Sequence, residues 1–321
     1  MGWFSPDPVL EVIFVRRFAA VLLAPILVGG LLSGCGGSTG PAVDKSLPTV
    51  TGHYGDKPKI TIAKGVKASK KLKSTVLTKG KGPKVRKGDL LVADYLGSNY
   101  RTRKVFDNSY DRKAPSAFPI GVGKVVTGWD KTLVGVNVGS RVLMVLPPKY
   151  GYGKAGNTQA GIKGTDSLIF VVDVIAAYGP NATLPAPKPV ASLPKGLPTV
   201  TGAWGVEPKV TLAKGTVPPK APVATVLATG TGPKVLKGHL LVVQYTAVSW
   251  EGKALGKTWG TGGPQGLPTS VSDLLVGEPV GSRVLLDLPP QQAGGDAKKE
   301  SVAVVIDILG QNGTAKEESA S

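Results

Sequence analysis

Cysteine and histidine are almost absent from this chain of 321 residues, which has one cysteine and two histidines. A disulfide framework needs paired cysteines, and a zinc site or a Cys–His catalytic pair needs clusters of these side chains. The sequence therefore argues against thiol chemistry and against a disulfide-stabilised fold. We expect no metal and no cofactor.

Aromatic residues are also scarce, at 6% of the chain, whereas the formal net charge is +18. Such a balance favours anionic surroundings, which include nucleic acid, lipid headgroups and wall polymers. The lysines are scattered through turns that contain glycine and proline, and they are not interleaved with aromatic residues as on a nucleic-acid surface. We predict no nucleic-acid partner.

Glycine and proline are abundant instead, with 44 and 27 residues. They separate short runs of valine, leucine and isoleucine without any Gly-X-Y period, which excludes collagen and is typical of antiparallel β structure. One short helix is expected where Thr127 and Asp130 form a start signal and Gly135 a stop signal. At roughly 100–200 residues per domain, the length allows about two domains.

The first 35 residues are typical of an export signal. Arg16 and Arg17 precede an apolar run over residues 18–32, and the sequence Leu-Ser-Gly-Cys follows, ending at Cys35. The run is short for a membrane span, and the pattern resembles a bacterial lipoprotein signal peptide, residues 1–35. The resemblance implies lipidation of Cys35 and attachment to the extracytoplasmic face of the cell membrane. An uncleaved anchor with an incidental cysteine is the alternative.

An internal repeat organises the rest of the chain. Residues 47–95 and 197–245 share 28 identities in 49 positions at a constant offset of 150, and similarity returns around Arg141 and Arg283. A duplication followed by the loss of residues from two loops explains this pattern. We predict a flexible tether at 36–46, two related domains at 47–178 and 197–310, a proline-rich linker at 179–196 and a disordered tail at 311–321.

Residues 86–178 contain five spaced motifs, which are KGDLLVADYLG, KVFDNSYDR, FPIGVGKVVTGWD, LVGVNVGSRVLMVLPPKYGYG and LIFVVDVI. In their order and spacing these motifs resemble the FKBP-type peptidyl-prolyl cis-trans isomerases, a family of macrolide-binding proteins. The resemblance implies an α+β fold in both repeats, each an antiparallel twisted β-sheet curved around one short helix. It also implies an apolar pocket that accepts a proline ring, with residues 86–178 as the catalytic core.

The resemblance assigns the pocket residue by residue. The family's catalytic positions fall on Asp107, Tyr152, Trp129 and Tyr95. Its substrate-binding positions fall on Phe106, Arg112, Phe118, Val125, Val126, Ile162 and Phe170. Trp129 would form the floor, and the Tyr152 hydroxyl would donate a hydrogen bond to a substrate carbonyl. Each aromatic residue alone also fits an ordinary core position, so the joint spacing carries the assignment.

This sequence departs from the family pattern at three places. Ser116 stands where an aromatic residue is common, Asn157 where a histidine is common, and residues 161–164 replace a usual Ile-Ile-Pro-Pro loop. The departures concern substrate preference and efficiency.

The function implied is isomerisation of X-Pro bonds in secreted or unfolded proteins outside the cytoplasmic membrane, with macrolides as ligands. The second repeat aligns Gly256 with Asp107 and Val271 with Trp129, so we expect a degenerate, inactive domain. The alternative function is a non-enzymatic lipoprotein that binds unfolded clients or serves as a surface binding protein.

Overall fold

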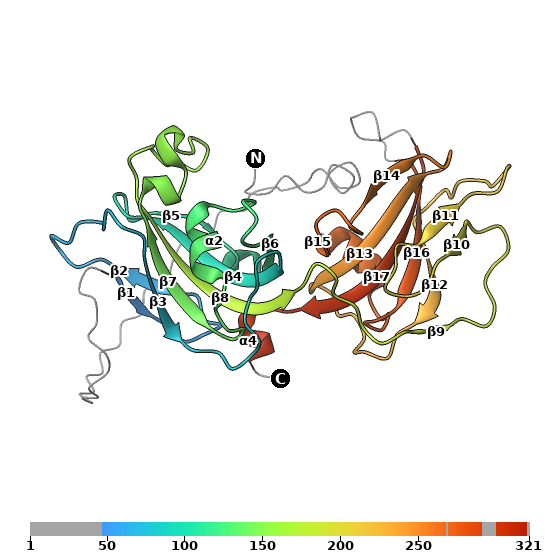
Figure 1. Ribbon diagram of the computed structural model, residues 1–321, viewed down its shortest axis with the longest axis horizontal. Helices are drawn as coiled ribbons and strands as arrows, with labels where there is room; N and C mark the ends of the chain where they lie inside the picture. Colours follow the sequence, from blue (N-terminus) through green and yellow to red (C-terminus); the bar gives the residue numbers. More distant parts are fainter. Residues whose placement is uncertain (1–46, 268, 291–299, 320–321) are drawn as a thin grey trace, which may run out of the picture.

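The computed structural model describes residues 47–267, 269–290 and 300–319. The expected signal peptide, the lipidation site Cys35 and the tether lie outside these residues. Two β-rich halves lie side by side (Figure 1). Within the described ranges, no helix has the length and apolar character needed to cross a membrane.

The first half is an antiparallel sheet with a ribbon on its outer face. The sheet order is β3-β7-β8-β4-β5, and β6 pairs with β4. The strands are β3 (Lys73–Thr78), β4 (Leu90–Asn99), β5 (Val105–Asn108), β6 (Ser116–Pro119), β7 (Arg141–Leu146) and β8 (Leu168–Tyr178). The ribbon consists of β1 (Thr49–Thr51) and β2 (Lys59–Thr61). Three 3-10 turns connect the strands: η1 (Tyr110–Arg112), η2 (Pro148–Tyr150) and η3 (Gly153–Ala155).

Alternation along the strands separates the two faces of this sheet. Met144 and Phe170 point inward and pack with the helix α2 (Thr127–Leu133), whereas Leu143 and Val171 point outward and pack with the ribbon residue Val50. The helix therefore lies on one face and the ribbon on the other, as Figure 1 shows.

The start of α2 differs from the sequence prediction. The N-cap residue is Val126, and no side chain caps the helix. Asp130 instead accepts hydrogen bonds from the backbone N–H groups of Gly121 and Gly123, at 2.6 and 2.8 Å, so its carboxylate orders the preceding loop. At the other end, Gly135 has a φ of +89°, a conformation that favours glycine after a helix.

The second half has the strand order of the first, with one further strand, β9, at its edge. Its sheet runs β14-β13-β17-β16-β12-β9, and β15 pairs with β13. The strands are β9 (Lys188–Pro189), β12 (Val223–Thr229), β13 (Leu240–Ser249), β14 (Ala254–Lys257), β15 (Gln265–Leu267), β16 (Arg283–Leu288) and β17 (Val302–Asn312). The outer ribbon is formed by β10 (Thr199–Thr201) and β11 (Lys209–Thr211). One turn of helix, α3 (Thr269–Ser272), and η4 (Asp273–Leu275) stand in the place of α2.

The linker and the tail both pack against the two halves. The proline-rich linker at 179–196 contains the extended strand β9, which pairs with β12 at the edge of the second sheet. The prediction of a disordered tail at 311–321 is wrong for its described part. There β17 continues to Asn312 and the helix α4 (Ala315–Glu318) follows, with its first residue buried against the first half. The sequence does not predict this contact, because the tail is polar and only one small apolar residue, Ala315, is buried.

The two halves meet through equivalent parts. Leu90 and Val92 of the first half lie in one buried cluster with Val242 of the second, where Val92 and Val242 are related by the repeat offset of 150. Asn312 Nδ2 donates to the Tyr178 hydroxyl oxygen at 3.1 Å, and these two residues end the equivalent strands β8 and β17. An interface in which equivalent residues meet is the arrangement of a two-fold dimer, here within one chain.

Asp287 is a buried carboxylate of the second half. The residue is 4% exposed, its Oδ1 has no hydrogen-bond partner among the described residues, and burial raises its pKa to about 6. The strand registers place Val145 at the equivalent position of the first half. The fold therefore does not need a carboxylate there.

We predict that Asp287→Val raises the free energy of unfolding at pH 7 by about 1–3 kcal/mol, because an ionised carboxylate without a partner is costly to bury. The folded-state pKa is raised above the ordinary value of 3.8, so the cost is present above about pH 6 and disappears as the pH falls toward 4. Urea unfolding of both proteins at pH 7 and pH 4 measures this. A gain of the same size at both pH values would contradict the assignment.

Candidate functional site

A cluster of aromatic rings covers the inner face of the first sheet beside α2. Trp129 lies at its centre, with edge-on contacts to Tyr95, Phe118 and Phe170 at centroid distances of 5.7, 4.9 and 5.4 Å. Phe106 contacts Phe170 in the same way at 5.7 Å. Four strands and the helix each contribute one ring. Phe106 is the only one of the five that is not buried, so it lies at the open side of the cluster.

Three polar side chains form one edge of this cluster. The Tyr95 hydroxyl donates to Asp107 Oδ2 at 2.5 Å, and Arg112 Nη1 donates to Asp107 Oδ1 at 2.7 Å. Arg112 Nη2 also donates to the Tyr95 hydroxyl oxygen at 2.9 Å, which closes the triangle. Burial and the bond to Asp107 raise the pKa of Tyr95, so its hydroxyl keeps its proton. We call Tyr95, Asp107 and Arg112 the polar rim.

The remaining predicted residues lie in the same place. Ile162 is buried in the aromatic cluster, and Val125, Val126 and Tyr152 pack against it. Burial raises the pKa of Tyr152, and a hydrogen bond with Asn157 acts in the opposite direction. The structure thus brings together every pocket residue that the resemblance assigns. It also gives Asn157, one of the departures, a role as a partner of Tyr152.

Ser116, another departure, borders the polar rim. Its hydroxyl oxygen accepts a hydrogen bond from Arg112 Nη2 at 3.4 Å. A small hydroxyl at this position leaves the rim more open than an aromatic ring would.

Gly97 is a site residue that sequence reasoning missed. A Cβ atom at this position would lie 2.7 Å from Phe106 Cζ and 2.8 Å from Phe170 Cε1, too close for either ring to stay in place. The second half has Ala247 at the equivalent position, with Leu255 in place of Phe106. A glycine inside a strand signals such a close approach, so this residue was accessible to sequence reasoning.

The second half keeps only one of the five rings. The strand registers and the repeat place Tyr245 at the position of Tyr95, with aliphatic residues at the other four positions. The replacements are Leu255 for Phe106, Leu267 for Phe118, Val271 for Trp129 and Val304 for Phe170. Gly256 stands opposite Ala247, where Asp107 stands opposite Gly97. This half therefore has a filled aliphatic core where the first half has aromatic rings and a carboxylate.

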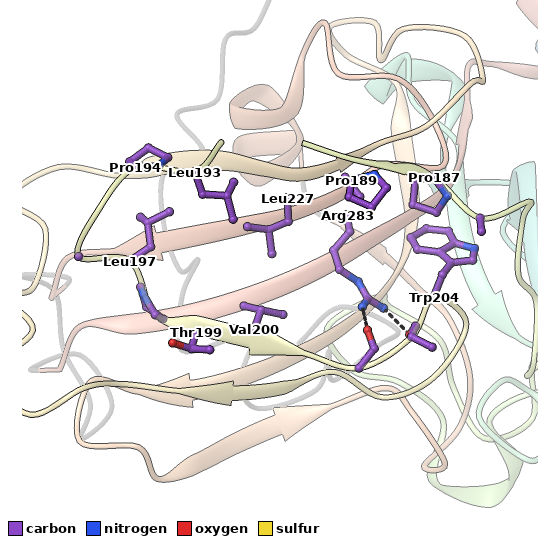
Figure 2. A pocket seen from close by; sticks show the side chains of 16 residues that line it. Pro187, Pro189, Leu193, Pro194, Leu197, Thr199, Val200, Trp204, Leu227 and Arg283 are labelled. Carbon is purple, nitrogen blue, oxygen red and sulfur yellow. Dashed lines mark hydrogen bonds between the residues drawn. The ribbon is translucent and has the colours of Figure 1, made fainter. Parts of the chain in front are cut away.

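A cavity of about 630 Å³ lies elsewhere, on the outer side of the second sheet. Figure 2 shows Pro187, Pro189 and Trp204 around Arg283 at one end and Leu193, Pro194 and Leu197 at the other. The Arg283 guanidinium is engaged by Asp307 and the carbonyl of Gly202, and the Trp204 indole N–H donates to the carbonyl of Leu184. The Arg283 guanidinium and the Trp204 indole of this cavity thus already make structural hydrogen bonds, and we assign no chemistry to the cavity.

In the part of the chain that the structure describes, no three or more His, Cys, Asp or Glu side chains are grouped to bind a metal ion.

A family profile matches the part of the chain that carries this site. The sequence profile of the family described as FKBP-type peptidyl-prolyl cis-trans isomerase matches residues 82–175. The FK506-binding protein of Streptomyces anulatus is 35% identical over 97 residues, which are 30% of this chain and 78% of that protein. FK506-binding protein 2 of Dictyostelium discoideum is 41% identical over 92 residues, 29% of this chain and 68% of that protein. FkpA from Escherichia coli is 36% identical, with a TM-score of 0.31 over 36% of this chain and 52% of that one.

We predict that Gly97→Ala lowers the free energy of unfolding of the first half by about 1–3 kcal/mol, because the added methyl group displaces the Phe106 and Phe170 rings. The second half supplies the comparison, since Ala247 coexists there with Leu255 and Val304 in place of the two rings. Adding Phe106→Leu to Gly97→Ala should recover part of the loss in urea unfolding, because it removes the contact with Phe106 and leaves the one with Phe170. A double variant no more stable than Gly97→Ala would show that Phe106 does not cause the crowding.

Proposed function

The chain belongs to the FKBP-type peptidyl-prolyl cis-trans isomerase family, and from this premise we propose that residues 86–178 catalyse the cis-trans isomerisation of X-Pro peptide bonds. The observation that carries the proposal is the aromatic cluster centred on Trp129 with Asp107 held at its edge by Tyr95 and Arg112. Apolar rings accept the proline ring, and the polar rim meets the peptide backbone beside it.

The chemistry needs no nucleophile and no proton transfer. Rotation about an X-Pro bond faces about 18–20 kcal/mol because amide resonance is lost in the twisted state. The twisted amide is less polar than the planar one, so a dry aromatic site destabilises the ground state relative to the transition state. In this proposal the Tyr152 hydroxyl donates to the substrate carbonyl, which orients the amide over Trp129.

Asp107 has an orienting role in this proposal. Both of its oxygens accept hydrogen bonds, one from Tyr95 and one from Arg112, so its charge is compensated and its position fixed. The side chains of Arg112 and Asp107 are 44% and 24% exposed, which puts this ion pair at the mouth of the site. A peptide that enters the site meets a rigid polar edge on one side and apolar rings on the other.

The second half, residues 197–310, is in our proposal a degenerate FKBP-like domain without catalytic activity. Apart from the added edge strand β9, its strand order is that of the first half, and its landmarks recur at the repeat offsets. Val271 in place of Trp129 and Gly256 in place of Asp107 remove the floor and the carboxylate together. We propose that it serves the protein as a structural unit.

The proposed setting is the extracytoplasmic face of the cell membrane, where the protein assists the folding of secreted proteins. The signal-like sequence that ends at Cys35 supports this location. Charge supports it as well, because residues 47–178 contain 23 Lys and Arg and 8 acidic residues, whereas residues 197–310 contain 10 and 8. A first half this basic suits an anionic surface.

We predict that the full chain accelerates isomerisation of an X-Pro peptide beyond the uncatalysed rate, which relaxes in tens of seconds, and that a macrolide of the FK506 type inhibits it. Trp129→Leu combined with Tyr152→Phe should lower kcat/KM by about a hundredfold, since each lost contact contributes about 1–2 kcal/mol to the transition state.

The matched control changes the second half at equivalent places. Val271→Leu combined with Tyr245→Phe should leave kcat/KM unchanged. Full activity in the first double variant would contradict the assigned site. Suppression of client aggregation without any isomerisation in the wild type would favour the client-binding alternative.

We predict that Cys35→Ala releases the protein from the membrane fraction. One diacylglyceryl group carries two acyl chains, and at about 0.8 kcal/mol per buried CH₂ two chains anchor firmly where one is marginal. Cell fractionation and metabolic labelling with a fatty-acid probe measure the effect. A wild type that takes up no label would refute the lipidation of Cys35.

A further inference from the structure

A buried carboxylate connects the end of the second half to the site in the first. Asp94 is fully buried in β4, next to Tyr95 of the polar rim. Its Oδ2 accepts a hydrogen bond from the backbone N–H of Ala315 at 2.7 Å. Ala315 is the first residue of α4, which follows the last strand of the second half and lies against the first half in Figure 1.

The other oxygen of this carboxylate holds Ser109. The Ser109 hydroxyl donates to Asp94 Oδ1 at 2.6 Å and accepts from the Tyr95 N–H at 2.9 Å. The Ser109 N–H donates to the Tyr95 carbonyl at 3.0 Å. Ser109 stands between β5, which carries Asp107, and η1, which carries Arg112. Its position therefore determines where the polar rim lies relative to β4.

The second half contains the same anchor without the carboxylate. Thr258 accepts from the Tyr245 N–H at 2.8 Å and donates its own N–H to the Tyr245 carbonyl at 3.0 Å, as Ser109 does with Tyr95. Gln244 replaces Asp94, and its Nε2 donates to the carbonyl of Pro180 at 3.2 Å. The fold thus keeps the serine or threonine anchor in both halves. The carboxylate link occurs in the half that has the aromatic site.

The helix α4 packs closely against the turn at Gly55, which holds Ala315 in place. A Cβ atom on Gly55, which has a φ of +87°, would lie 2.7 Å from Lys316 Cα. The Gly55 N–H also donates to Asp173 Oδ2 at 2.8 Å, which fixes the turn below the helix. Without the Ala315 N–H, the buried Asp94 carboxylate would keep Ser109 as its one remaining hydrogen-bond donor among those described. A carboxylate in that state takes up a proton or admits water, and either change disturbs Ser109.

We propose that Asp94 and Ser109 are positioning residues for the polar rim and that α4, contributed by the second half, completes them. The second half then acts on the isomerase site through two hydrogen bonds to the Asp94 carboxylate, one from the Ala315 N–H and one from the Ser109 hydroxyl, and Ser109 belongs to the segment 106–112. This inference rests on the proposed isomerase function, and it gives the degenerate half a role in that function.

The test compares three changes in the full chain: Ser109→Ala, Asp94→Asn and termination after Gly313. Each should lower kcat/KM for an X-Pro peptide by about tenfold, because a small displacement of the rim misplaces the bound amide. Termination after Gly313 combined with Ser109→Ala should lower it no further than Ser109→Ala alone, since both act on one path. Independent, multiplying losses would overturn the path.

Two matched variants separate positioning from general stability. Ser109→Thr should retain wild-type activity, because Thr258 makes the same anchor in the second half. Lys316→Ala removes the exposed ion pair with Asp56 but leaves the Ala315 N–H in place, and it should also retain activity. A loss in Lys316→Ala equal to that of the truncation would show that docking as such, and not Asp94, matters.

Hydrogen exchange provides a readout that does not depend on activity. In the chain that ends at Gly313, the amides of residues 106–112 should exchange at least several-fold faster, while those of β7 and β8 stay protected. Unchanged exchange at 106–112 would overturn the positioning role even if the wild type is active. An inactive wild type with faster exchange would refute the isomerase function and leave the structural path standing.

Discussion

A buried ion pair between adjacent strands holds each half together, and both halves have it. Arg141 and Asp173 join β7 to β8, with the side chains 1% and 0% exposed, and Arg283 and Asp307 repeat the contact between β16 and β17. Such a pair is stable only when its other donors are satisfied, and removing one partner costs about 3–5 kcal/mol. The outer ribbon meets this need, since Arg141 Nη1 donates to the Gly52 carbonyl at 2.7 Å. The ion pair therefore locks ribbon and sheet into one unit.

In the first half, the same ion pair extends toward the site. The Tyr110 hydroxyl donates to Asp173 Oδ2 at 3.0 Å, and Tyr110 begins the turn that carries Arg112. Asp173 also accepts from the N–H of Gly55, on which α4 rests. A polar network on the outer face thus supports the aromatic site on the inner face. The two faces depend on each other although the sheet separates them.

The two halves show that one framework supports two different inner faces. Aliphatic side chains such as Leu255, Val271 and Val304 fill the second half and tolerate a methyl group at Ala247. The five rings of the first half need more room, and Gly97 provides it. Aromatic rings that meet edge-on form a rigid apolar surface of defined shape, whereas branched aliphatic side chains fill the same volume. The second half therefore keeps an intact sheet without these rings.

The sequence by itself indicated the strands and the internal repeat, because these depend on alternation and spacing along short stretches of chain. The resemblance to a known family, and not periodicity, assigned Trp129 and Phe170 to one pocket. Gly97 was missed, although a glycine inside a strand is a signal of close approach. Other features follow only from the path of the whole chain. Asp94 meets the N–H of a residue 221 positions away, and the tail of which that residue is part reads as disordered because its composition is polar. Asp130 looks like a helix cap but binds the loop before the helix. Such contacts join residues that have no periodic relation, and only the folded backbone brings them within hydrogen-bonding distance.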